Sequence, residues 1–136
     1  MRNLKILASG VASAAAVAFV VSCGSSASTA TTSPSASCTP SLSPNTLVIQ
    51  NNQICPQTLT VTRGAQITIL NSDSRNHTMD SDPHPEHTDC PELNQIGFLN
   101  PGQSRQSGNL NIARKCGFHD HDAPGTAGLK GTITIQ

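Results

Sequence analysis

The chain has 136 residues, of which 12% are charged, and its Lys plus Arg and its Asp plus Glu are equal at 8 each. This length is enough for one domain with a modest core, which excludes a multidomain enzyme. The balanced charge gives no field of one sign for nucleic acid, and three Phe without Trp or Tyr provide few rings on which single strands could stack.

The first residues have the pattern of an export signal. Arg2 and Lys5 precede an apolar or small-residue run over 6–21, which is shorter than the roughly 20 residues of a membrane-spanning helix. The run ends in VVSC, and this ending resembles the lipobox of bacterial lipoproteins. The resemblance implies that Cys23 is lipidated and anchors the exported protein to a bacterial membrane, facing the periplasm or the cell surface. The alternative is an ordinary signal peptide that is cleaved elsewhere.

The composition then divides the chain into three parts. Residues 23–45 are mostly Ser, Thr, Ala, Gly and Pro, which bury too little apolar surface to offset the entropy of ordering them. We therefore predict a lipoprotein signal peptide at 1–22, a flexible tether at 23–45 and a folded domain at 46–136.

The predicted domain alternates apolar and polar residues with a period of two. Leu59 and Val61 alternate with Thr, and Ile133 and Ile135 do the same near the end of the chain. Further short strands are expected around residues 47–50, 67–69, 76–79, 95–99, 104–110 and 113–118. About eight short strands without a helical stripe predict an all-β Greek-key sandwich or barrel.

Metal-ligand chemistry is concentrated in one stretch, because every Asp, Glu and His lies between positions 73 and 122. The sequence Asn-His-Thr-Met places His77 directly after a predicted strand. Some forty residues later Cys-Gly-Phe-His-Asp-His places Cys116, His119 and His121 just before the loop that leads into the last strand.

This order of strand, His, long excursion, Pro-Gly turn, Cys-x-x-His and terminal strand resembles the cupredoxins, the blue-copper family, over roughly residues 46–136. The resemblance implies a cupredoxin-like sandwich in which His77, Cys116 and His119 hold one copper ion. A thiolate and two imidazoles suit both oxidation states of copper, so the implied role is one-electron transfer rather than enzymatic chemistry.

The sequence departs from the family pattern at the axial ligand. Cupredoxins usually carry a Met beyond the second His, and this chain has no Met after Met79. In an extended chain His119 and His121 point to one face, so His121 is the expected substitute and a fourth ligand. Met79 is a further candidate ligand, although packing in the core is its expected role.

A second cluster spans residues 80–90, which read DSDPHPEHTDC. Its members His84, His87 and Cys90 are further candidate ligands, which would cap the first site or bind a second ion. The alternative is a solvated polar loop.

Four cysteines other than Cys23 decide between thiolate and disulfide chemistry. Cys38 with Cys55 is the easy bridge, worth ~3 kcal/mol in the chain-entropy model. We predict that Cys116 binds copper, with Cys90 free, a further ligand or paired elsewhere. If Cys90 and Cys116 join each other, copper would have only His ligands in a type-2-like site, or the domain would be structural.

The predicted function is therefore that of a lipid-anchored, extracytoplasmic copper protein that passes single electrons to an unidentified redox partner. A copper-holding or delivery module that exchanges copper with a protein partner is one alternative, and a metal-free, disulfide-stapled structural sandwich is another. Zinc is a less favoured metal than copper. A hydrolase built on Cys116 and His119 is disfavoured, because no third group orients the pair. No nucleic-acid partner is expected, and the membrane is contacted only through the lipid.

Overall fold

The computed structural model describes residues 38–136. The predicted signal peptide, Cys23 and the tether as far as residue 37 lie outside the described residues. Within 38–136, no helix has the length and apolar character needed to cross a membrane.

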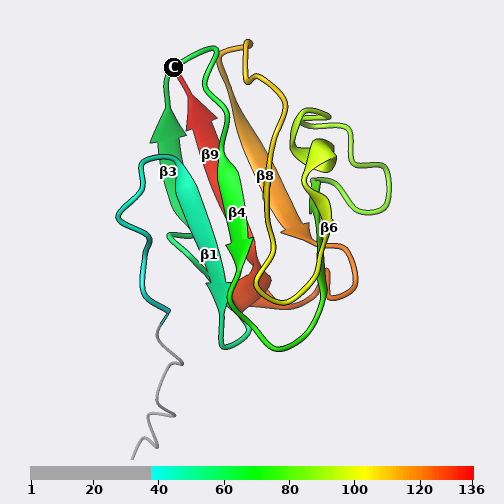
Figure 1. The fold of residues 1–136 in the computed structure, drawn as a ribbon. Helices are drawn as coiled ribbons and strands as arrows, with labels where there is room; N and C mark the ends of the chain where they lie inside the picture. Colours follow the sequence, from blue (N-terminus) through cyan, green and yellow to red (C-terminus); the bar gives the residue numbers. More distant parts are fainter. Residues whose placement is uncertain (1–37) are drawn as a thin grey trace, which may run out of the picture. The chain divides into compact units, whose positions relative to one another are not determined.

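In the described part of the chain, nine strands form two sheets that pack face to face, and two short 3₁₀ helices lie in the connections between strands (Figure 1). The strands are β1 (Thr46–Gln50), β2 (Gln53–Cys55), β3 (Thr58–Val61), β4 (Thr68–Asn71), β5 (His77–Ser81), β6 (Gly97–Leu99), β7 (Ser104–Gln106), β8 (Arg114–Asp120) and β9 (Lys130–Ile135). The 3₁₀ helices are η1 (Leu93–Gln95) and η2 (Ala127–Leu129). The predicted all-β sandwich is confirmed.

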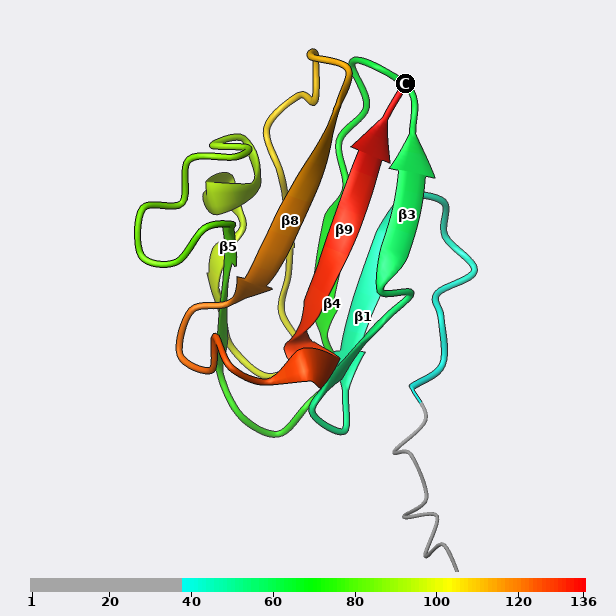
Figure 2. The same ribbon diagram turned by 180° about the vertical axis from the view of Figure 1, so that it is seen from behind.

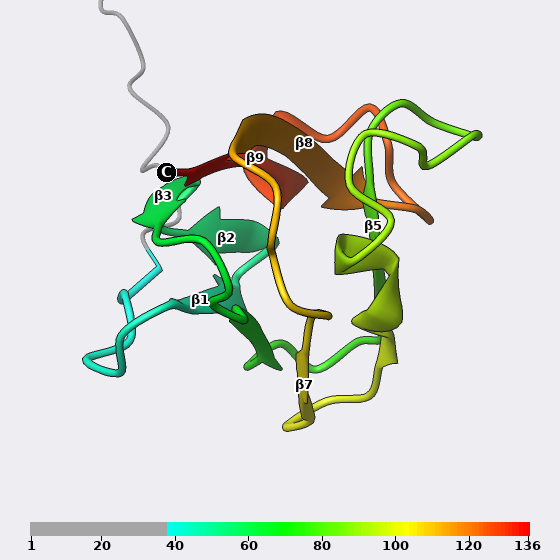
Figure 3. The same ribbon diagram turned by 90° about the horizontal axis from the view of Figure 1, so that it is seen from above.

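The chain crosses repeatedly between the two layers (Figure 3). The first sheet has the order β2-β1-β4-β7 and the second has the order β3-β9-β8-β5-β6. Each sheet contains one parallel pair, β1 with β4 and β3 with β9. In Figure 2 the strands β3, β9, β8 and β5 lie in front, with β1 and β4 behind them.

The core lies between the sheets and is almost entirely aliphatic. The period of two in the sequence places one side of each strand inward, as the buried residues of β9, Ile133 and Ile135, show. The fully buried members of this core include Leu47, Ile49, Ile54, Ile67, Ile69, Met79, Leu93, Ile96, Leu99, Leu110, Leu129 and Ile133. Phe118 supplies an aromatic ring to the same cluster.

Two strand ends differ from the prediction. The strand expected at 104–110 stops at Gln106, because the amides of Ser107 and Leu110 donate to the carbonyls of Ile67 and Ala65. The strand expected to end at Phe118 continues to Asp120 as β8, because its pairing with both β5 and β9 continues. His119 and Asp120 therefore lie inside a strand, with their side chains on opposite faces of the sheet.

Candidate metal centre

Four of the five histidines lie together at the β5–β8 side of the second sheet. His119 belongs to β8 and His121 follows it, while His84 and His87 belong to the excursion at residues 82–92, which lies beside β5 and β8 in Figure 2. The ring centroids of the contacting pairs are 5.0 to 5.6 Å apart. We call these four residues the imidazole cluster.

Strand pairing positions the half of the cluster that comes from β8. Asp80 of β5 is the cross-strand partner of His119, so the two side chains stand next to each other on one face. The amide of His121 donates to the carbonyl of Thr78 at 2.7 Å, which holds His121 against β5 beyond the end of β8. The alternation expected for residues 119 and 121 thus brings both rings to one site.

The excursion that carries His84 and His87 is fastened to the sheet at both ends. The amide of Asp82 donates to the carbonyl of Gly117 at 3.0 Å, and Cys90 forms a disulfide with Cys116 of β8. The side chain of Asn94 also holds the excursion in place. Its Oδ1 accepts a hydrogen bond from the amide of Ser81, and its Nδ2 donates one to the carbonyl of His87. The loop is therefore held over β8 by bonds from several directions.

Hydrogen bonds fix the orientation of two rings so that each turns one nitrogen into the cluster. Nδ1 of His87 lies 2.9 Å from the carbonyl of Ser81, which can only accept, so this nitrogen carries the proton. Nδ1 of His119 lies 2.6 Å from the carboxylate of Asp82 and donates to it in the same way. A ring that carries its proton on Nδ1 and binds a metal ion does so through the lone pair of Nε2, which here is turned into the cluster.

The Nε2 atom of His119 is buried and has no hydrogen-bond partner. Its side chain is only 1% exposed, so water does not compensate for the missing bond. An unpaired buried acceptor costs free energy, and a cation in the cluster would satisfy it. The donor set therefore fits a metal ion that prefers imidazole nitrogen.

Two sets of three side chains bring their ligand atoms within 4.8 Å of one another: His84, His87 and His119, and Asp80, His87 and His121. Two imidazole nitrogens bound to one ion at about 2.0–2.1 Å lie at most about 4.2 Å apart, so the side chains would move slightly inward on binding. Partial desolvation, followed by the charges of His121, His119 and His87, lowers the pKa of His84, while Glu86 acts in the opposite direction. His84 thus stays neutral, and able to bind a metal, to a lower pH than a free imidazole.

The predicted thiolate ligand is corrected by the structure. The sulfur of Cys116 is bonded to Cys90, and Cys38 is bonded to Cys55, so the four described cysteines are all paired. Cys116 points into the core, on the opposite face from His119, because the two residues are three apart in an extended strand. Neither Cys116 nor Cys90 is therefore a ligand in this structure.

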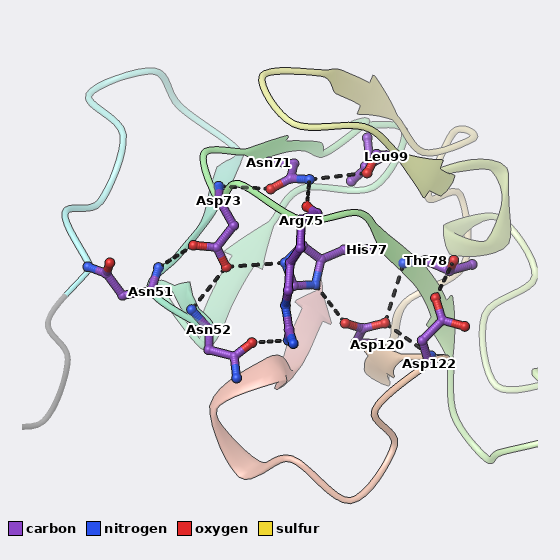
Figure 4. A network of polar contacts seen from close by, with 10 residues as sticks. All are labelled: Asn51, Asn52, Asn71, Asp73, Arg75, His77, Thr78, Leu99, Asp120 and Asp122. Carbon is purple, nitrogen blue, oxygen red and sulfur yellow. Dashed lines mark hydrogen bonds and ion pairs between the residues drawn. The ribbon is translucent and has the colours of Figure 1, made fainter.

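His77, the other predicted ligand, is separated from the cluster. Its ring is fully buried between two carboxylates, with Nδ1 at 2.7 Å from Asp120 and Nε2 at 3.2 Å from Asp73 (Figure 4). Both of its nitrogens are turned toward these carboxylates, so neither is directed at the imidazole cluster. Met79 faces the core at 1% exposure, which is the packing role expected of it.

Sequence reasoning missed Asp80 and Asp82. Their signal was present in the run DSDPHPEH, where two carboxylates precede two imidazoles within eight residues. What could not be read was that β5 continues to Ser81 and pairs with β8, which aligns both carboxylates with His119.

Comparison with known proteins supports the fold. No protein-family model matches the sequence, and no curated protein matches it. Among solved structures, the chain is similar to a purple cupredoxin from Nitrosopumilus maritimus, with a TM-score of 0.51 and 16% identity over 67% of this chain and 98% of that one. It is also similar to oxidised plastocyanin from Dryopteris crassirhizoma, with a TM-score of 0.52 and 19% identity over 67% and 99%. A Cu(I) form of an amicyanin variant gives a TM-score of 0.51 and 15% identity over 68% and 82%. The domain has the cupredoxin fold.

Proposed function

We propose that this protein is an extracytoplasmic copper-binding protein that holds one copper ion in the imidazole cluster. The observation that carries the proposal is the Nε2 atom of His119, which is buried and unpartnered in a ring that contacts two other imidazoles, those of His84 and His87. His84 and His87 would supply further nitrogens, with His121 next to them in the cluster, and Asp82 and the carbonyl of Ser81 keep two of the rings in the binding orientation.

Copper is favoured over other divalent ions by the ligand type. Among first-row metals copper binds a given nitrogen site most tightly, and an imidazole-rich set suits it. The cupredoxin fold of the domain adds support, since a solved structure of the same fold is a Cu(I) form. Zinc is the competing ion, because it also accepts imidazole and carboxylate in a tetrahedral arrangement.

The cluster fits copper holding and delivery better than electron transfer. A thiolate that would serve both oxidation states is absent from the described residues, because their cysteines are all in disulfides. The side chain of His121 is 44% exposed and His84 is exposed, so an incoming ligand can reach the ion. One-electron transfer is the alternative that the fold alone suggests, and reversible reduction of the loaded protein would favour it.

Two disulfides in the described domain are typical of an oxidising compartment, which supports export. We extend the proposal to anchoring through lipidated Cys23 and to copper exchange with a protein partner outside the cytoplasm.

Copper titration of the full chain tests the proposal. We expect one Cu(II) per chain, weak visible absorption without an intense thiolate-to-copper band, and nitrogen couplings in the paramagnetic resonance spectrum. His119→Ala should weaken Cu(I) binding at least ~10-fold, since it removes the most buried ligand. The matched control is His77→Gln, which removes the one histidine outside the cluster and should keep the stoichiometry at a temperature where the variant is folded.

Absence of Cu(II) binding by the wild-type chain would refute the proposal. Equal Cu(I) affinity of the wild type and His119→Ala would refute the assignment of the site.

A further inference from the structure

The two ligand sets of the cluster share one atom. His87 belongs to both, and its Nδ1 is engaged by the carbonyl of Ser81, so Nε2, which lies 3.1 Å from Nδ1 of His121, is the one nitrogen that either set can use. One nitrogen has one lone pair in the ring plane and binds one ion. The two sets are therefore alternatives for a single ion rather than two filled sites.

The two sets differ in chemical character. The set with His84 and His119 consists of imidazoles alone, whereas the other contains the carboxylate of Asp80 beside His121. Oδ2 of Asp80 lies 3.5 Å from Nδ1 of His121, and the Asp80 side chain is 16% exposed, so its charge is only partly screened by water. A carboxylate is a hard, charged ligand that binds a divalent ion much better than a monovalent one.

We propose that Asp80 is the residue by which the site distinguishes the oxidation states of copper. It binds Cu(II) together with His87 and His121, and it is not a ligand of Cu(I), which His84, His87 and His119 hold. This inference rests on the proposed function and adds the role of one carboxylate to it.

The test is Asp80→Asn in the full chain, with affinities for Cu(II) and Cu(I) measured separately by competition with chelators specific for each state. Asn has the shape of Asp, so β5 and its pairing are retained. We expect Cu(II) affinity to fall ~10-fold or more and Cu(I) affinity to change less than ~2-fold. A tenfold difference between the two states corresponds to a rise of about 59 mV in the midpoint potential of a one-electron couple.

The matched control is Glu86→Gln, which removes an equal charge from the excursion but belongs to neither ligand set. Its two affinities should change equally and by less than ~2-fold. The inference is overturned if Asp80→Asn lowers the affinities for Cu(II) and Cu(I) equally, or if Glu86→Gln has the same effect as Asp80→Asn. Either result would mean that Asp80 acts only through its charge, and the proposal of copper binding would stand. If the wild-type chain binds neither state, the proposed function fails instead.

Discussion

At the scale of single residues, the imidazole cluster depends on the contacts of Asp82 with β8. Its carboxylate accepts from Nδ1 of His119 at 2.6 Å, and it lies where Gly117 has no side chain. A Cβ at position 117 would overlap the Asp82 carboxylate, so the glycine leaves room for the partner of the buried imidazole. Asp82 is thus a positioning residue that fixes which nitrogen of His119 faces the ion.

Replacing Asp82 by Asn should lower Cu(I) affinity by about 10- to 100-fold, the usual effect of losing a carboxylate that orients a histidine ligand. The side chain of Asp82 is 42% exposed, so the free energy of unfolding of the metal-free protein should change little. Chelator competition and urea unfolding measure the two quantities. Asp89→Asn, which alters an exposed carboxylate of the same excursion, is the control and should bind copper as the wild type does. Unchanged affinity in Asp82→Asn would show that His119 needs no orienting partner.

At the scale of elements, the disulfide between Cys90 and Cys116 joins the excursion to β8. The bonded residues are 26 positions apart, and Cys116 lies three residues before His119 in the same strand. The disulfide therefore holds the excursion, which carries His84 and His87, close to β8, which carries His119 and precedes His121. The second disulfide, Cys38 with Cys55, is at the end of β2 and joins the start of the described chain to the first sheet.

The two disulfides allow a matched pair of variants. Cys90→Ala with Cys116→Ala should cost about 3–4 kcal/mol of unfolding free energy and also weaken copper binding, because the excursion loses its anchor. Cys38→Ala with Cys55→Ala should cost about 3 kcal/mol and leave copper affinity unchanged. Urea unfolding and chelator competition at low temperature, where both variants are folded, measure this. Equal copper affinity in both double variants would mean that the hydrogen bonds of Asn94 and Asp82 hold the excursion without the bridge.

The strands were predictable from sequence where apolar and polar residues alternate regularly. The course of the excursion was not predictable. The period of two located β3 and β9, and it also placed His119 and His121 on one face. The pairing of Cys90 with Cys116 was left open, since four cysteines allow three pairings and no local signal chooses among them. His84 and His87 therefore appeared only as additional candidate ligands, because only the tertiary bonds of the excursion bring them to β8.

At the scale of the whole molecule, the fold and the site have to be argued separately. The likeness to purple cupredoxin and plastocyanin, at 16% and 19% identity, concerns the sandwich. Within that sandwich His77 has a connecting role, since Asp73 also accepts from the amides of Asn51 and Asn52 in the turn of the first sheet, while Asp120 belongs to the second (Figure 4). The buried imidazole thus links the two sheets, and the metal candidates are the other four histidines.

The stability of the whole domain should depend on pH through His84. The folded-state pKa of His84 is lowered from 6.5, first by partial desolvation and then by the charges of His121, His119 and His87, whereas in the unfolded chain it has its ordinary value. The unfolded state then binds more protons as the pH falls below 6.5, so stability is fully present above that value and decreases on acidification.

We therefore expect the metal-free protein to lose unfolding free energy between pH 7.5 and pH 5.5, and His84→Ala to lose less over the same range. Glu86→Gln is the opposing variant, because Glu86 raises the pKa of His84 and its removal should deepen the decrease. The copper-loaded protein should lose more unfolding free energy over this pH range than either metal-free variant, because ligand imidazoles must be neutral and protons compete with the ion. Urea unfolding at both pH values, with and without Cu(II), measures all four slopes. Identical slopes for the wild type and His84→Ala would show that His84 does not sense the other three rings.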